Sequence, residues 1–154
     1  MRNQYKRRTR SLYSLLAVLA FASVNGCAVK MVSDYDARLA QEINEVSKEV
    51  DVFYGGLIET KESDRMYSKY KDKYIQIEVD IRSLLVQNKK RPLNSESSNV
   101  IEKTLNKWLK YKKAHSDTNA YKTGLAKIHR TRFTRHFSAM TAAEEAKKLT
   151  QKTN

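Results

Sequence analysis

Three histidines are the side chains of this 154-residue chain best suited to metal binding or proton transfer. His129 and His136 are seven residues apart, so on a helix they share a face but lie about 10 Å apart. That separation is too large for one zinc ion, which needs each ligating nitrogen at about 2.1 Å. Neighbouring arginines would also repel a metal ion, namely Arg130, Arg132 and Arg135. We predict no metal site and no other cofactor, with His115, His129 and His136 solvated or packed at the surface.

Carboxylates and nucleophiles give no stronger indication of catalysis. Two acidic groups, Glu42/Glu45/Glu49 and Glu144/Glu145, fall on expected helix faces where charge normally faces water. General acid or base catalysis would require burial and a suitable partner. The sequence contains neither a G-x-S-x-G nucleophile motif nor a glycine-rich phosphate loop. The chain is therefore predicted not to be an enzyme.

The only cysteine, Cys27, follows a leader with the anatomy of a signal peptide. The apolar segment 12–24 would rise only about 20 Å as a helix, which is short of the ~30 Å hydrocarbon core of a bilayer. We therefore expect a cleaved targeting segment rather than a permanent transmembrane anchor. Basic residues precede this segment and are expected to hold the N-terminus in the cytoplasm: Arg2, Lys6, Arg7, Arg8 and Arg10.

The four residues Val24-Asn25-Gly26-Cys27 resemble the lipobox of bacterial lipoproteins, with Asn25 as the position that departs from the usual small or β-branched residue. The resemblance implies cleavage after Gly26, a diacylglyceryl group on the Cys27 sulfur, and acylation of the new N-terminus. Two or more acyl chains anchor a protein stably. Ala28 in place of aspartate implies sorting to the outer membrane in enteric-type bacteria. The alternatives are an ordinary secretory signal with a chance cysteine and a cysteine that simply packs.

The part of the chain after Cys27 has few turn-forming residues, three glycines and one proline. This composition favours an all-α fold over a many-stranded sheet. We predict a three- or four-helix bundle with coiled-coil-like seams over residues 33–150. A cleaved signal peptide (1–26) and a lipidated tether (27–32) would precede the bundle, and a disordered tail (151–154) would follow it.

Two segments carry apolar residues at alternating spacings of three and four, the pattern of a coiled-coil seam. The first helix is expected to begin with Ser33 as its N-cap, and the second to begin at Ser63 or Asp64 and end near Gln87. The first seam consists of Leu39, Ile43, Val46, Val50, Phe53 and Leu57. The second consists of Tyr67, Tyr70, Tyr74, Ile77, Ile81 and Leu84, whose tyrosines are expected in the core or at a helix interface rather than at a ligand.

The remaining helices are separated from these by a predicted loop over residues 88–99. A third helix is expected from about Ser98 to His115, and residues 116–119 could either cap a fourth helix or bend a continuous one. The inner face of the third helix is predicted to hold Ile101, Leu105, Leu109 and, as the main core anchor, Trp108. That of the fourth is predicted to hold Tyr121, Leu125, Ile128, Phe133, Phe137 and Met140.

Positive charge is concentrated in the C-terminal half. Residues 27–86 hold nine Lys/Arg against twelve Asp/Glu, whereas residues 87–154 hold sixteen against five. Such an excess attracts polyanions. The candidate anion-binding residues lie in one basic stretch: Lys122, Lys127, Arg130, Arg132 and Arg135. The alternative is a solvated helix exterior whose aromatic residues point inward.

An exported protein meets the components of the cell envelope rather than nucleic acid, so we expect the partners of this positive charge in the envelope. In layout the chain resembles the many small bacterial lipoproteins that join a lipobox to a helical domain. We therefore expect a protein with a structural or protein-interaction role, attached to the membrane through lipid on Cys27 and located at the outer membrane facing the periplasm. The alternative function is binding of phospholipid or lipopolysaccharide by the basic C-terminal helices. The partner and the oligomeric state stay open.

Overall fold

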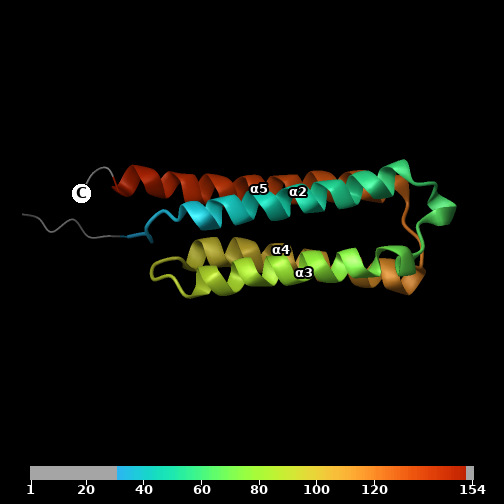
Figure 1. Cartoon of the computed structure of the whole chain (residues 1–154), viewed down its shortest axis with the longest axis horizontal. Helices are drawn as coiled ribbons and strands as arrows, with labels where there is room; N and C mark the ends of the chain where they lie inside the picture. Colours follow the sequence, from blue (N-terminus) through green and yellow to red (C-terminus); the bar gives the residue numbers. More distant parts are fainter. Residues whose placement is uncertain (1–30, 152–154) are drawn as a thin grey trace, which may run out of the picture. The chain divides into compact units, whose positions relative to one another are not determined.

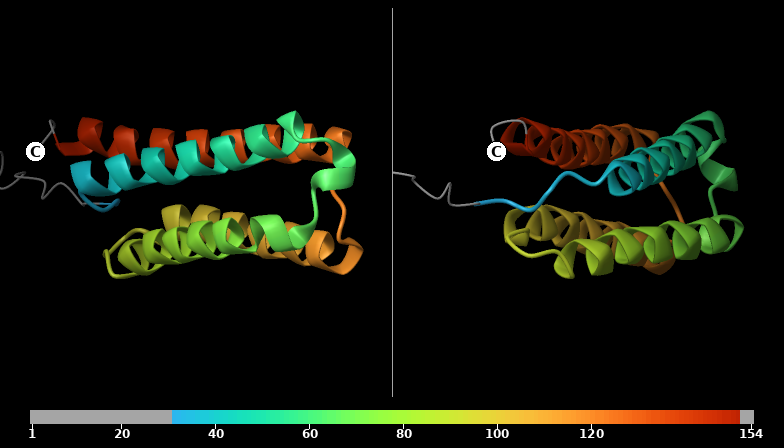
Figure 2. Two further views of the ribbon diagram at one scale, coloured as in Figure 1. Left: turned by 45° about the vertical axis from the view of Figure 1, so that its right-hand side comes forward. Right: turned by 60° about the vertical axis from the view of Figure 1, so that its left-hand side comes forward.

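The computed structural model describes residues 31–151, and these residues form four α-helices without a strand. They are α2 (Ala37–Glu59), α3 (Tyr67–Lys89), α4 (Ser95–Thr118) and α5 (Thr123–Gln151), with a short 3-10 helix, η1 (Glu62–Asp64), between the first two. Helices α2 and α5 form one layer and α3 and α4 the other, with successive helices antiparallel (Figures 1 and 2). The predicted all-α fold is confirmed, and the bundle has four helices rather than three.

The two predicted seams form the core. All six apolar residues of the first seam are buried, and so are the last four residues of the second. Tyr67 and Tyr70 are partly buried and pack against this core. The tyrosine stripe therefore lies in the core and at its edge, as predicted.

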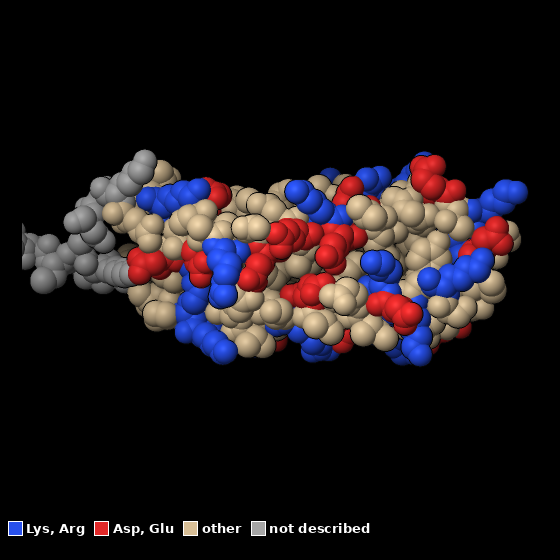
Figure 3. Space-filling view, viewed as in Figure 1, with Lys and Arg blue, Asp and Glu red and all other residues tan. Residues whose placement is uncertain are grey.

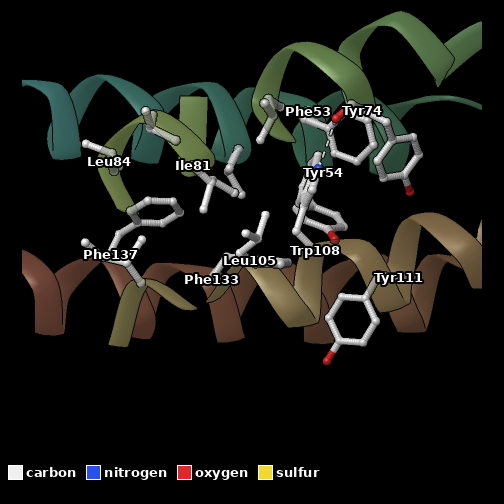
Figure 4. Close-up of a cluster of buried hydrophobic side chains, with 14 of the residues drawn as sticks. Phe53, Tyr54, Tyr74, Ile81, Leu84, Leu105, Trp108, Tyr111, Phe133 and Phe137 are labelled. Atoms are coloured by element: carbon white, nitrogen blue, oxygen red, sulfur yellow. Dashed lines mark hydrogen bonds between the residues drawn. The ribbon is translucent and has the colours of Figure 1, made fainter. Parts of the chain in front are cut away.

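Trp108 is the main anchor of an aromatic cluster at the centre of the bundle, as expected (Figure 4). Its side chain is fully buried, and its indole N–H donates to the Tyr74 carbonyl at 3.0 Å. The rings of Phe53, Tyr74 and Phe133 lie within 5.5 Å of the Trp108 ring, measured between centroids. Since large aromatic side chains bury more area than aliphatic ones, this cluster joins all four helices.

The helix starts differ from those predicted. Asp36, rather than Ser33, is the N-cap of α2, and its carboxylate accepts from the Leu39 N–H at 3.1 Å. Ser33 is buried against the loop between α3 and α4 instead. Neither Ser63 nor Asp64 caps α3, because both lie within η1 and α3 begins only at Tyr67.

The start of α3 is capped from a distant part of the chain. Asn119 ends α4 in the left-handed region (φ 48°), a conformation that asparagine tolerates better than most residues. Its side-chain oxygen accepts from the Tyr67 N–H at 2.9 Å. One residue thus terminates α4 and caps α3, and the open choice at residues 116–119 is resolved as two separate helices.

Two further expectations about the second half are wrong. The predicted loop over 88–99 is shorter, because α4 already begins at Ser95. On α5, Leu125 and Ile128 are about half exposed, and the inward positions are Ala126 and His129. Phe133, Phe137 and Met140 are buried as predicted.

Candidate functional site at the tether end of the bundle

One end of the bundle brings together residues 31–36, the α3–α4 loop and the last turns of α5, and we call this the tether end. Ser33 donates its backbone N–H to the Leu93 carbonyl at 3.3 Å and its hydroxyl to Asn94 Oδ1 at 3.0 Å. The Asp36 N–H donates to Glu144 at 2.9 Å, and Arg91 donates to the Asp34 carbonyl. The segment before α2 is therefore fixed to the loop and to α5.

A buried ionic cluster lies beneath this segment. Arg91 binds both oxygens of Glu144, at 2.8 and 3.0 Å, and Lys147 Nζ lies 2.6 Å from the same carboxylate. Lys147 also donates to Asn94 at 2.6 Å. Glu144 is 2% exposed and Lys147 4%. The prediction that Glu144 faces water is wrong, because two cations and a backbone N–H replace the water it loses.

Glu144 is ionised at neutral pH. Burial alone would raise the pKa of Glu144, but the hydrogen bonds from Arg91, Lys147 and the Asp36 N–H outweigh burial and hold this pKa below its usual value. A carboxylate with all its acceptor sites occupied is poorly suited to take up a proton. The arrangement therefore suits the cluster to holding the segment before α2 on the bundle rather than to transferring protons.

An apolar hollow of about 370 Å³ adjoins the cluster. Its apolar lining comes from the segment before α2, from the α3–α4 loop and from α5: Met31, Val32, Leu93, Ala143 and Ala146. Met31 and Leu93 are also among the most exposed large apolar side chains. The tether end thus combines a fixed polar cluster with exposed apolar surface.

At the opposite end of α2, two of the histidines are buried, contrary to the prediction. The His115 ring donates through Nε2 to the Arg65 carbonyl at 2.7 Å and accepts at Nδ1 from the Tyr74 hydroxyl at 3.2 Å. His129 Nδ1 lies 2.5 Å from the Tyr121 hydroxyl, and its ring stacks on Tyr111. Burial lowers the pKa of both, and with the Arg132 charge it brings the pKa of His129 to about 4.

These histidines are structural groups held in the neutral form. Within residues 31–151, no three or more His, Cys, Asp or Glu side chains are grouped so as to hold a metal ion. No helix of that part of the chain is long and apolar enough to cross a membrane.

The cations predicted to bind anions do not share one face. Arg130 turns toward α2 and forms two contacts of 2.6 Å with Asp51. Arg132 turns toward α4 and donates to the Tyr111 hydroxyl at 2.9 Å. The other three are exposed on or just before α5: Lys122, Lys127 and Arg135.

Sequence reasoning did not identify the cations that matter most for the fold. Arg65 is 2% exposed and donates to the carbonyls of Ile58, Thr60 and Tyr121 and to the Thr123 hydroxyl. Arg91 and Lys147 were likewise not singled out. No spacing marks such residues, because an isolated charge in a sequence normally indicates a solvated position.

The predicted cleavage and lipidation residues, Gly26 and Cys27, lie outside the described residues. Comparisons with protein-family models, with curated proteins and with solved structures found no match.

Proposed function

We propose that this chain is a bacterial lipoprotein, attached through Cys27 to the outer membrane and facing the periplasm, whose helical bundle has a structural or protein-interaction role. The observation that supports this most strongly is the attachment of residues 33–36 to the bundle by side-chain and backbone hydrogen bonds. These contacts give the segment that would follow the lipid a fixed place on the bundle.

The length of the connecting chain adds to this argument. Three residues lie between Cys27 and Met31, and the four Cα–Cα steps from one to the other span at most about 14 Å in extended chain. A lipid on Cys27 would therefore keep the tether end close to the bilayer surface. The exposed apolar side chains Met31 and Leu93 at this end are compatible with such a surface.

The way in which the buried titratable groups are used supports the proposal of a non-catalytic role. Glu144 is occupied by Arg91 and Lys147, His115 by Arg65 and Tyr74, and His129 by Tyr121. An active site would need such a group directed toward a substrate.

The interaction role is supported by an apolar stripe on the outer face of α3. Ile75, Val79 and Val86 are 43%, 54% and 53% exposed and are spaced by four and seven residues, so they lie on one side of the helix. A photocrosslinker at Val79 is expected to capture an envelope protein in the native host, whereas one at Val52 on α2 is not. Equal capture at both positions would contradict a specific interface on α3.

The lipid is tested by labelling. The wild-type chain is expected to incorporate radiolabelled palmitate in its host, and Cys27→Ser is expected to lose all label because no other cysteine is present. Ala28→Ser is the matched control, since it alters the neighbouring residue and keeps the thiol. Label retained by Cys27→Ser would refute lipidation at this residue.

A second function, anion binding by the C-terminal helices, is favoured by one observation. Several cations along α4 and α5 have no acidic partner among the described residues.

A further inference from the structure

The apolar hollow at the tether end lies beside the segment through which the chain enters the bundle. Residues 31–36 pass between the α3–α4 loop and the last turns of α5 (Figures 1 and 2). Met31 and Val32 of this segment line the hollow, and Ala143 and Ala146 line it from α5. Because the two alanine side chains are small, they leave space between α5 and the start of α4. The hollow of about 370 Å³ is therefore part of the attachment region itself.

The polar side chains deepest in this region leave the hollow apolar, because their polar atoms are occupied elsewhere. Lys147 Nζ is bound to Glu144 and Asn94, so the apolar stem of Lys147 is what lines the hollow. The Asn94 oxygen also accepts from Ser33, and the Thr150 hydroxyl donates to the Lys147 carbonyl at 2.8 Å. An apolar ligand would therefore break no hydrogen bond of these side chains. The other polar lining residues belong to the largely exposed first turn of α4: Ser95, Glu96 and Ser97.

Leu93, which also lines the hollow, has a backbone conformation that is unfavourable for leucine. Its φ is 55°, in the left-handed region that glycine and asparagine tolerate best. The Leu93 carbonyl accepts from the Ser33 N–H, but glycine or asparagine would offer the same carbonyl with less strain. The fold does not explain the leucine side chain, which is 56% exposed, beside Met31 at 81%. An apolar side chain kept exposed at a strained position indicates a ligand that covers it.

The neighbouring flank of the bundle is charged in contrast. Acidic side chains gather over α2 and α3 in the middle of the face shown in Figure 3. In the first turns of α2, Glu42 binds both Arg38 and Gln87. These groups would lose their water if an apolar ligand covered them. An apolar ligand near the start of α2 therefore fits the hollow better than this flank.

We propose that the hollow is an acyl-chain binding site, occupied by one acyl chain of the lipid on Cys27. This occupant rests on the lipidation of Cys27 proposed above. The chain from Cys27 to Met31 spans at most about 14 Å, and an acyl chain spans about half of the ~30 Å hydrocarbon core of a bilayer, so one acyl chain can reach the hollow. Covalent attachment also raises the effective concentration of the acyl chain there. The other acyl chains stay in the bilayer and hold the protein on it.

The size and the solvation of the hollow suit this occupant. An apolar cavity of about 150 Å³ is large enough to bind benzene. The hollow, at about 370 Å³, has room for a longer stretch of hydrocarbon. An acyl chain that enters it from the bilayer exchanges one apolar environment for another, whereas the lining of the hollow is removed from water. The hydrophobic effect therefore favours the occupied hollow through side chains such as Met31 and Leu93.

A photoreactive fatty acid tests this occupancy in the protein as its host produces it. The host is grown with a palmitate analogue that carries a diazirine near its methyl end, and the isolated membranes are irradiated. Crosslinked peptides are then identified by mass spectrometry. We expect the lipid-bearing peptide that contains Cys27 to be crosslinked to peptides that contain Leu93, Ala143 or Ala146. The product should migrate as a monomer, because the crosslink lies within one chain.

A variant that fills the hollow supplies the matched comparison. Ala146→Trp places a large side chain in the hollow and should remove most of these crosslinks. Ala142→Trp is the control, since Ala142 is an exposed residue of α5 outside the lining, and it should retain them. Circular dichroism of both variants verifies that the bundle is folded. Equal crosslinking in the two tryptophan variants would overturn the site.

Leu93→Asn tests the part of the strained residue. Asparagine tolerates the left-handed backbone, so the thermal stability of the bundle should be kept or raised, while the crosslinks should decrease because the apolar cover is lost. A loss of thermal stability with unchanged crosslinking would assign the leucine to the fold and overturn its role in the site.

The remaining products separate the proposed occupant from others. Phospholipid adducts at Leu93 or Ala146 without the Cys27 peptide would show that the hollow takes a membrane lipid, and a crosslinked dimer would assign it to the lipid of a second copy. Either result overturns the proposed occupant. A protein that carries the fatty acid on Cys27 without these crosslinks overturns the site alone. A protein that incorporates no fatty acid overturns the lipid anchor together with the site.

Discussion

At the scale of single residues, the buried histidines couple folding to pH. His129 has a pKa of about 4 in the bundle against 6.5 for an ordinary histidine. Because the folded value is lower, the unfolded chain binds more protons as the pH falls below 6.5. The contribution of His129 is therefore complete above pH 6.5 and is lost progressively down to pH 4. We expect the free energy of unfolding to fall by about 2–3 kcal/mol over this range from His129 alone.

Urea unfolding at several pH values tests this expectation. His129→Gln cannot titrate, so its stability should depend less on pH than that of the wild type between pH 6.5 and 4. His136→Gln, at a half-buried position, is the control and should keep most of the wild-type dependence. An unchanged pH dependence in His129→Gln would show that His129 is not buried in the neutral form.

Tyr54 offers a second test at this scale. Its hydroxyl is the one buried side-chain polar atom of residues 31–151 without a hydrogen-bond partner. Tyr121 is near, with 6.2 Å between ring centroids, but its hydroxyl is engaged by His129. Tyr54→Phe removes the unsatisfied group and keeps the ring, so it should leave the stability unchanged or raise it by up to about 1 kcal/mol. A loss of stability on thermal or urea unfolding would reveal a partner for the hydroxyl, and Tyr74→Phe, which removes a bonded hydroxyl, is the contrasting control.

At the scale of elements, Arg65 joins the ends of three helices. Its guanidinium binds carbonyls at the end of α2 and in the α4–α5 link, together with a hydroxyl at the start of α5. Lysine retains the charge but cannot reach four acceptors arranged around a planar group. Arg65→Lys should lower the free energy of unfolding by about 2–3 kcal/mol, whereas Arg82→Lys on the exposed face of α3 should change it by less than about 0.5 kcal/mol. Similar losses for the two variants would contradict this role of Arg65.

The helices also show which features the sequence could predict. The seams of α2 and α3 were predictable because their apolar residues keep a 3.5-residue period without interruption. The inward face of α5 was not, since Leu125 and Ile128 are more apolar than the buried Ala126 and His129. His129 stacks on Tyr111 of α4 there, so a polar side chain takes an inward position that hydrophobicity alone would give to its neighbours.

The buried charged residues of the candidate site could not be predicted from the sequence either. The sequence pattern places Glu144 at a solvent-facing position, because burial of a lone carboxylate would be costly. They are buried because Arg91, Lys147 and Glu144 meet from two separate parts of the chain. Such a meeting depends on tertiary structure, so the cluster at the tether end could only be seen in the folded bundle.

At the scale of the whole molecule, the described residues 31–151 belong to one compact unit. Every residue of the hydrophobic core lies between Leu39 and Met140. We therefore expect a fragment of residues 28–154 to fold without the leader, with helical circular dichroism and a single cooperative unfolding transition. A disordered fragment would contradict the independence of the bundle.

A shorter fragment measures what the tether segment contributes. Residues 37–154 keep the core but lose the contacts of Ser33 and Asp36, including the N-cap of α2. This fragment should stay helical and be less stable than residues 28–154 by about 2 kcal/mol. Equal stability of the two fragments would show that the tether segment rests on the bundle without stabilising it.

The attachment at Ser33 and Asp36 also determines how the bundle would respond to mechanical force. A pull on the chain before Met31 does not act first on the N-terminus of α2, because the α3–α4 loop and α5 hold the intervening residues through Leu93, Asn94 and Glu144. The tension is divided among these contacts, which must break before α2 can peel away from α5. The segment ahead of α2 therefore takes up a pulling force before the helices do, and the helical core is protected from loads applied at its N-terminal end.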